Sequence, residues 1–97
     1  MRLRFSWDEE KERQNRRKHG VSFEEAASIF HNLPLEVFHD PDHSELEERY
    51  IAAGFSDRSR LLLVVHCENH SGTEIRIISA RKATRAERRT LFGGIAP

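Results

Sequence analysis

The chain has 97 residues, which fits one domain with a modest hydrophobic core and leaves no room for a second. Its composition, 37% hydrophobic and 33% charged residues, predicts a small, highly charged soluble protein. No apolar run approaches the ~20 residues that span a bilayer, and the first residues contain no long apolar segment of the kind found in a signal peptide. Cys67 is the only cysteine. We therefore expect a cytoplasmic protein without membrane contact or internal disulfide.

The net charge is zero, but the charges are segregated along the chain. Residues 1–20 carry a net +3, residues 21–57 a net −8 and residues 58–97 a net +5. If the basic ends meet in space, they form a surface that attracts phosphates, while the acidic middle suits a basic partner. The alternative is a solvated surface whose charges balance without a partner.

The first elements are a short strand and a polar helix. Apolar and polar residues alternate over residues 3–7, which predicts a strand. Asp8 is a suitable N-cap and Gly20 a suitable C-cap for the helix between them. This helix has no apolar side chain, so we expect Trp7 and Val21 to hold its ends on the surface, where it is either solvated or a binding face.

The next elements are a better-specified helix and a strand. Ser22 and Glu25 form the sequence pattern of a capping box, and apolar residues follow at helical spacing. Pro34 should end this helix, and residues 35–38 predict a short strand before the turn-rich segment 40–44.

The second half of the chain predicts a three-stranded antiparallel meander and a last helix. The expected strands cover about residues 48–56, 60–67 and 73–80. The middle one is apolar without alternation, so we expect it to be central and covered on both faces. A capping box at Thr84 opens a helix to about Phe92. The predicted fold class is α+β, with N-terminal and C-terminal helices packed on an antiparallel sheet. Residues 1–92 would form the single domain and 93–97 a flexible tail.

Arginines in and after the last strand are the strongest indication of function. The basic residues there are Arg76, Arg81, Lys82, Arg85, Arg88 and Arg89. We expect the helix arginines and Arg81 to form one cationic rim beside Arg76, because the planar arginine fork suits phosphate. In the alternative, Arg76 pairs with Glu48 or Glu74 and the helix is solvated.

If the substrate is RNA, cleavage without a metal needs a base, an acid and cations. Glu48, His19 and His66 are candidates for proton transfer. His66 lies at the end of a buried strand, which favours a structural role. His19 ends the first helix and is also placed to interact with the helix carbonyl end.

The sequence predicts no metal site and no cofactor. His39 and His43 have a ligand-like spacing, with Asp40 and Asp42 between them, but no second ligand pair accompanies them. Cys67 ends a buried strand, which favours an ordinary thiol over a nucleophile.

Several motifs, taken together, resemble the BrnT family of toxins. They are Phe5-Ser6-Trp7-Asp8, Asn15, Lys18-His19-Gly20-Val21-Ser22-Phe23-Glu24-Glu25-Ala26, Asp42-His43-Ser44, Glu48-Arg49-Tyr50, Gly54, Arg76-Ile77-Ile78-Ser79-Ala80-Arg81-Lys82-Ala83 and Glu87-Arg88. The resemblance spans about residues 3–89, and its combined order is highly specific.

The resemblance implies a bacterial type II toxin–antitoxin toxin with a RelE-like fold and a ribonuclease activity that halts translation. It also implies a BrnA-like antitoxin with a ribbon-helix-helix domain. The antitoxin, not the toxin, would contact operator DNA. From charge alone, the acidic segment 21–57 is a candidate surface for a basic partner.

The chain departs from the family pattern at two places. Such toxins often have an arginine just after the central strand, where this chain has Glu68-Asn69-His70. The last helix also lacks the tyrosine that often closes it. If the missing arginine contacts phosphate, we expect weaker cleavage here or an inactive relative.

The leading interpretation is a metal-independent endoribonuclease. Arg76 and Arg81 would hold the phosphate, with Arg49 as a third candidate, and Glu48 or His19 would transfer protons. The residues expected along the RNA backbone are Lys18, Lys82, Arg85, Arg88 and Arg89. The alternatives are a noncatalytic protein- or RNA-binding module and, last, a metal-dependent nuclease using the acids around Asp40.

Overall fold

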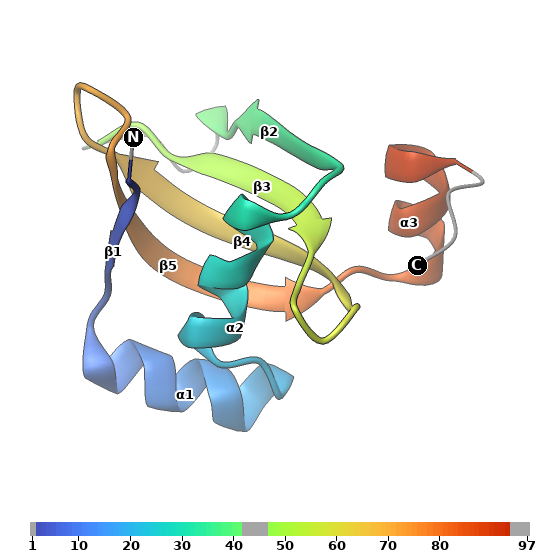
Figure 1. Cartoon of the computed structure of the whole chain (residues 1–97). Helices are drawn as coiled ribbons and strands as arrows, with labels where there is room; N and C mark the ends of the chain where they lie inside the picture. Colours follow the sequence, from blue (N-terminus) through green and yellow to red (C-terminus); the bar gives the residue numbers. More distant parts are fainter. Residues whose placement is uncertain (1, 42–46, 94–97) are drawn as a thin grey trace.

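A five-stranded sheet forms the centre of the computed structural model, which describes residues 2–41 and 47–93. The strands are β1 (Arg4–Ser6), β2 (Leu35–His39), β3 (Tyr50–Phe55), β4 (Leu61–Glu68) and β5 (Glu74–Lys82). The helices are α1 (Glu9–His19), α2 (Phe23–Ser28) with the 3₁₀ turn η1 (Ile29–His31), and α3 (Arg85–Phe92) (Figure 1). Most of the predicted turn at 40–44, and all but Gly93 of the predicted tail, lie outside the described residues.

The sheet is mixed, so the prediction of a purely antiparallel sheet is wrong. Strands β2 to β5 are antiparallel, as expected, and the order is β1-β5-β4-β3-β2. Strand β1 instead runs parallel to β5, with Phe5 opposite Ile75. Alternation within a short strand predicts the strand itself, but it carries no information on the direction of a partner distant in sequence.

The main core lies between one face of the sheet and the segment that contains α2. Its fully buried side chains include Val21, Phe23, Ala26, Ile29, Leu62 and Val64. Gly54 lets the chain approach closely here, because an added Cβ would lie 3.1 Å from Leu35 Cδ1 and 3.3 Å from Ile29 Cβ. This face is therefore closed to solvent.

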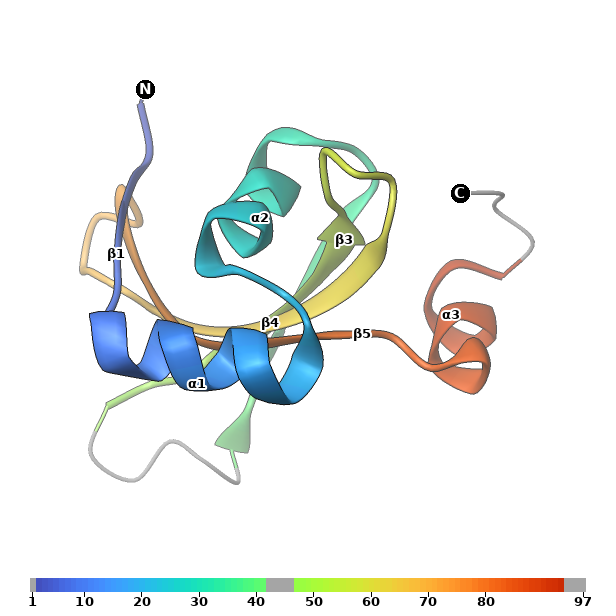
Figure 2. The ribbon, with the colours of Figure 1, turned by 90° about the horizontal axis from the view of Figure 1, so that it is seen from below.

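The opposite face of the sheet is partly open, which corrects the expectation that β4 is covered on both faces. Leu61 packs with Phe92 of α3, whereas Leu63 and Val65 are only half-buried. Figure 2 shows the reason: α2 lies over β4 and β5, while α3 lies beyond the end of β5. A helix in that position covers one end of the face and leaves its middle accessible.

Helix α1 is attached to the sheet by a buried amide. Trp7 and Val21 flank the helix as expected: Val21 is fully buried and Trp7 packs edge-on against Phe23. Asn15, however, donates to the carbonyls of Val21 and Ala80 at 2.9 and 2.8 Å and accepts from the Ala80 N–H at 3.0 Å. These contacts attach α1 to β5, and the buried Glu12 adds a second anchor by accepting from the Phe23 N–H at 3.3 Å. Helix periodicity reveals neither role.

The predicted capping box of α2 is only half formed. Ser22 Oγ accepts from the Glu25 N–H at 3.0 Å, as the pattern predicts. The buried Glu25 carboxylate instead accepts from Ser56 Oγ at 2.7 Å and from Arg60. The hydrogen bond from Arg60 holds the pKa of Glu25 below its usual value. This carboxylate joins α2 to the β3–β4 turn, because a buried charge is stable only when paired.

We predict that Asn15→Ala destabilises the fold by about 2–4 kcal/mol, because it leaves buried backbone groups of Val21 and Ala80 without partners. Urea unfolding measures this change. The matched control is Gln14→Ala, which removes an exposed amide from the same helix and should change stability by less than about 0.5 kcal/mol. Equal losses for both variants would contradict the anchoring role of Asn15.

Candidate functional site

An irregularity in β5 decides which side chains share the open face. Val65 is paired with Ser79, but the next residue of β4, His66, is paired with Ile77, so one residue of β5 is inserted between them. Residues five apart in a regular strand point to opposite faces. The insertion reverses this and places Arg76 and Arg81 on the same face, the one turned away from α2.

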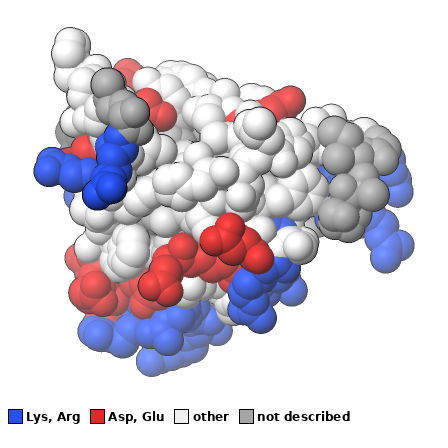
Figure 3. Space-filling model, viewed as in Figure 1, with Lys and Arg blue, Asp and Glu red and all other residues white. Residues whose placement is uncertain are grey.

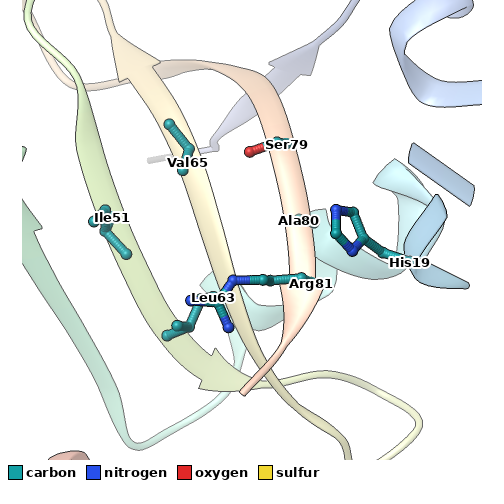
Figure 4. Close-up of a pocket in the computed structure, with 7 residues that line it drawn as sticks. All are labelled: His19, Ile51, Leu63, Val65, Ser79, Ala80 and Arg81. Atoms are coloured by element: carbon teal, nitrogen blue, oxygen red, sulfur yellow. The ribbon is translucent and has the colours of Figure 1, made fainter. Parts of the chain in front are cut away.

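A cavity of about 270 Å³ lies in the middle of this open face. It is lined by His19, Ile51, Leu63, Val65, Ser79, Ala80 and Arg81 (Figure 4). His19 reaches it from the end of α1, and the Arg81 side chain extends from β5 toward Leu63. The structure thus brings together two of the predicted catalytic residues, His19 and Arg81. Ser79 joins them, although sequence reasoning had assigned it no role.

The guanidinium of Arg81 forms an ion pair with the carboxylate of Glu87. Its two terminal nitrogens each donate to an oxygen of Glu87 at 2.8 Å, and Glu87 also accepts from the Thr84 N–H at 2.8 Å in the predicted capping box. The hydrogen bonds from Arg81, followed by those from Thr84, lower the pKa of Glu87 to about 2. Glu87 therefore stays ionised, and an incoming phosphate must share or displace it.

Arg76 lies at the other end of the open face, in a separate cluster. Its partner is Glu47, at 2.6 Å, and not Glu48 or Glu74 as the alternative interpretation expected. A hydrogen bond from Cys67, and then the charges of Arg76 and Arg49, lower the pKa of Glu47.

This second cluster is well separated from the cavity at Arg81. Arg76 is opposite Cys67 and Arg81 opposite Leu63, four positions along β4. That spacing separates the two arginines by about 13 Å along the sheet. The structure thus places Arg49 with Arg76 and keeps both apart from Arg81.

The remaining acid–base candidates lie elsewhere. Glu48 forms a hydrogen bond with His39, whose ring is 5.7 Å from that of Tyr50. His66 is fully buried beside the Tyr50 ring, with Nε2 at 3.1 Å from Glu68, on the side of the sheet covered by α2. The structural role expected for His66 fits this burial, and His19 is the candidate placed in the cavity.

The basic residues predicted to follow the RNA backbone fall into two groups, one beside α1 and one around α3. Lys18 lines a second cavity of about 280 Å³ with Lys11 and Gln14, and this cavity shares His19 and Ser79 with the first. Arg81 belongs to β5 rather than to a helix. Helix α3 follows the end of β5 that carries Arg81, whereas Arg76 lies near the opposite end of this strand. The expected rim beside Arg76 is therefore wrong.

The second basic group surrounds α3. Lys82, Arg85 and Arg89 are exposed, while the Arg88 guanidinium lies 5.4 Å from the centre of the Phe55 ring. Figure 3 shows basic side chains along α1 and around α3, with acidic side chains between the basic edge of α1 and an uncharged area in the middle of the view.

Asn69, which lies where the resemblance led us to expect an arginine, stabilises a turn in this structure. Asn69 Oδ1 accepts from the N–H groups of Thr73 and Glu74 at 2.9 and 3.0 Å, which closes the β4–β5 turn.

Of the candidate metal pair, His39 is described, whereas His43 lies outside the described residues. Among residues 2–41 and 47–93, no three histidine, cysteine or acidic side chains are grouped to hold a metal, and no helix is long and apolar enough to span a membrane.

Residues 7–87 match the family described as the ribonuclease toxin, BrnT, of type II toxin–antitoxin systems. The chain belongs to the BrnT family. Its fold is similar to that of the Brucella abortus ribonuclease toxin BrnT in a crystal structure, with a TM-score of 0.63 and 24% identity over 86% of this chain and 99% of that one. Comparison with curated proteins gives no match.

Membership of the BrnT family establishes the general function. The chain is a ribonuclease toxin of a type II toxin–antitoxin system, which implies an RNA substrate and an antitoxin partner. The α+β architecture around one sheet agrees with that of the Brucella toxin.

We predict that the ion pair between Glu87 and Arg81 makes stability depend on pH at the acidic end. The pKa of Glu87 falls from 4.5 to about 2 on folding, so its contribution is complete above pH 4.5 and is lost as the pH falls toward 2. Glu87→Gln keeps a capping side chain but removes the charge. At pH 7 we expect it to cost about 1 kcal/mol, since solvent screens the half-exposed pair.

Urea unfolding at pH 7 and at pH 2.5 measures this dependence. The difference between the parent protein and Glu87→Gln should shrink at the lower pH. A difference that is the same at both pH values would show that the charge of Glu87 is not what stabilises the fold.

Proposed function

We propose that this BrnT-family toxin is a metal-independent endoribonuclease that cleaves RNA at the open face of its sheet and thereby inhibits translation. The observation that supports this most directly is the cavity in which His19, Ser79 and Arg81 meet. It combines a proton carrier, a hydroxyl and a permanent cation, which are the groups that metal-free phosphoryl transfer needs.

In the proposed reaction, the 2′-hydroxyl of the RNA attacks the adjacent phosphorus. A base takes the hydroxyl proton, the bond from phosphorus to the 5′-oxygen of the next nucleotide breaks, and that oxygen gains a proton. The products are a 2′,3′-cyclic phosphate and a 5′-hydroxyl. His19 is our candidate for proton transfer, with Glu48 as the alternative, and Arg81 would stabilise the charge on phosphorus.

Other basic residues would hold the RNA on either side of the cavity. We propose that Arg76 and Arg49 bind a phosphate about 13 Å along the strand from Arg81. The proposed backbone contacts are Lys18 near the α1 side and Lys82, Arg85, Arg88 and Arg89 near α3. Such binding should weaken steeply with salt, because each neutralised phosphate releases counterions.

The proposed partner is a BrnA-like antitoxin with a ribbon-helix-helix domain, which would contact operator DNA on behalf of the complex. The acidic segment 21–57 is our candidate for the surface that a basic antitoxin segment meets. A RelE-like fold, a single domain over residues 1–92 and a cytoplasmic location complete the proposal. The absence of an apolar span among the described helices is compatible with it.

A second candidate function is a noncatalytic module that binds RNA or protein. Two observations favour it: Glu87 occupies the fork of Arg81, and Asn69 stands where the family often has an arginine. Such a module would bind RNA in a salt-sensitive manner and create no new RNA ends.

We predict that the purified toxin cuts ribosome-free RNA in excess EDTA and that Arg81→Ala reduces the cleavage rate at least a hundredfold. The control is Arg4→Ala, which also removes an arginine paired with a glutamate, Glu74, but outside the cavity. New RNA ends are counted by primer extension. Equal cleavage by the parent and Arg81→Ala would place the site elsewhere. If the parent cleaves RNA without EDTA but not in EDTA, cleavage depends on a metal and the proposal of metal independence is wrong.

We also predict that His19→Gln slows cleavage a hundredfold or more while RNA binding changes little, because glutamine keeps a polar side chain but cannot take up or release a proton as a base or acid. His70→Gln, in the exposed β4–β5 turn, is the matched histidine control and should retain activity. A fully active His19→Gln would exclude His19, and the same test on Glu48→Gln would then examine the alternative proton carrier.

A further inference from the structure

A third, largely apolar cavity adjoins the one that contains Arg81. It has a volume of about 340 Å³ and lies between the open face of the sheet and α3. Its lining residues are Phe38, Ile51, Leu63, Ala86, Glu87, Thr90 and Leu91. Neither the proton-transfer residues nor the basic track of the proposed reaction uses this space.

The two cavities are adjacent and share part of their walls. Ile51 and Leu63 line both of them. Glu87, in the wall of the apolar cavity, is the residue that holds Arg81 in the other. The apolar cavity is therefore within the space into which the uncharged part of a ligand bound through its phosphate at Arg81 can extend.

An exposed aromatic ring forms the outer wall of this apolar cavity. Phe38 belongs to the edge strand β2 and is 39% exposed, although a phenylalanine gains stability by burial. It is paired with Ile51, on the face of the sheet that carries Arg81. Strands β3 and β4 separate Phe38 from Arg81, and Ile51 and Leu63 of these strands line the space between them. An accessible ring across a surface from a cationic side chain is an arrangement by which proteins bind the base and the phosphate of a nucleotide.

We propose that this cavity is a base-binding subsite, in which the base of the nucleotide held through its phosphate at Arg81 stacks on Phe38. The apolar walls from Leu91 and Ile51 fit the faces of the base, and the Thr90 hydroxyl and Glu87 carboxylate are the polar groups available to its edge. Stacking on one ring tolerates any base, so preference among bases would come from these two side chains. The proposal deepens the proposed ribonuclease function and rests on it.

The test measures binding of a short 2′-O-methyl RNA, which lacks the attacking hydroxyl and so separates binding from cleavage. Phe38→Ala should weaken binding roughly 5- to 150-fold, the range that a lost base–aromatic stack gives. Val37→Ala is the matched control. Val37 is the neighbouring residue, is 45% exposed and points to the opposite face of the strand, so this variant should bind as tightly as the parent.

Phe38→Trp keeps an aromatic surface and adds a spectroscopic signal. It should bind within about threefold of the parent, and stacking should quench its added fluorescence on titration with the same RNA. Wild-type affinity in Phe38→Ala, or no quenching in Phe38→Trp, overturns the proposal. If Phe38→Ala instead weakens only antitoxin binding, the occupant is a protein side chain and the proposal is also overturned.

Arg81→Ala in the same assay distinguishes a failure of the base subsite from a failure of the phosphate site at Arg81. If it weakens RNA binding and Phe38→Ala does not, the base subsite is wrong while the phosphate site stands. If neither variant weakens binding, RNA does not use this face, and both the subsite and the proposed location of the reaction fail.

Discussion

The side-chain amide of Asn15 forms the hydrogen bonds that a neighbouring strand would form at the edge of β5. The geometry of the open face depends on these bonds. Strand β1 pairs only with Glu74–Arg76, so the backbone of Ala80 would otherwise lie unpaired beneath α1. Asn15 satisfies both backbone groups of Ala80, and His19 follows four residues later, on the same side of the helix. A polar contact, rather than an apolar stripe, thus brings His19 to the cavity.

The inserted residue in β5 has a comparable effect on the arginines. With regular alternation, Arg76 and Arg81 would point to opposite faces, and one of them would be driven into the core beneath α2. The insertion near Val65 turns both toward solvent on one face. The position of α3 beyond the end of β5 then leaves the middle of that face uncovered. Attachment of α1, strand irregularity and helix position together produce a site that no single motif defines.

Local signals predicted local structure well, and long-range geometry less well. The caps at Asp8 and Thr84 and the antiparallel meander follow from short sequence patterns and are confirmed. The parallel direction of β1, the inserted residue and the open face depend on distant contacts that alternation does not encode. Likewise, His19 was identifiable as a candidate from the sequence, but its proximity to Arg81, and the pairing of Arg81 with Glu87, were not.

RNA binding to the sheet face opposite α2 can be mapped by the amide NMR shifts of the protein during titration with a 2′-O-methyl RNA. We expect the largest shift changes at His19, Ser79 and Arg81, with little change at Ser56 and Arg60, which lie against α2. Large changes at Ser56 and Arg60, with unchanged signals around the cavity, would show that RNA binds the opposite face.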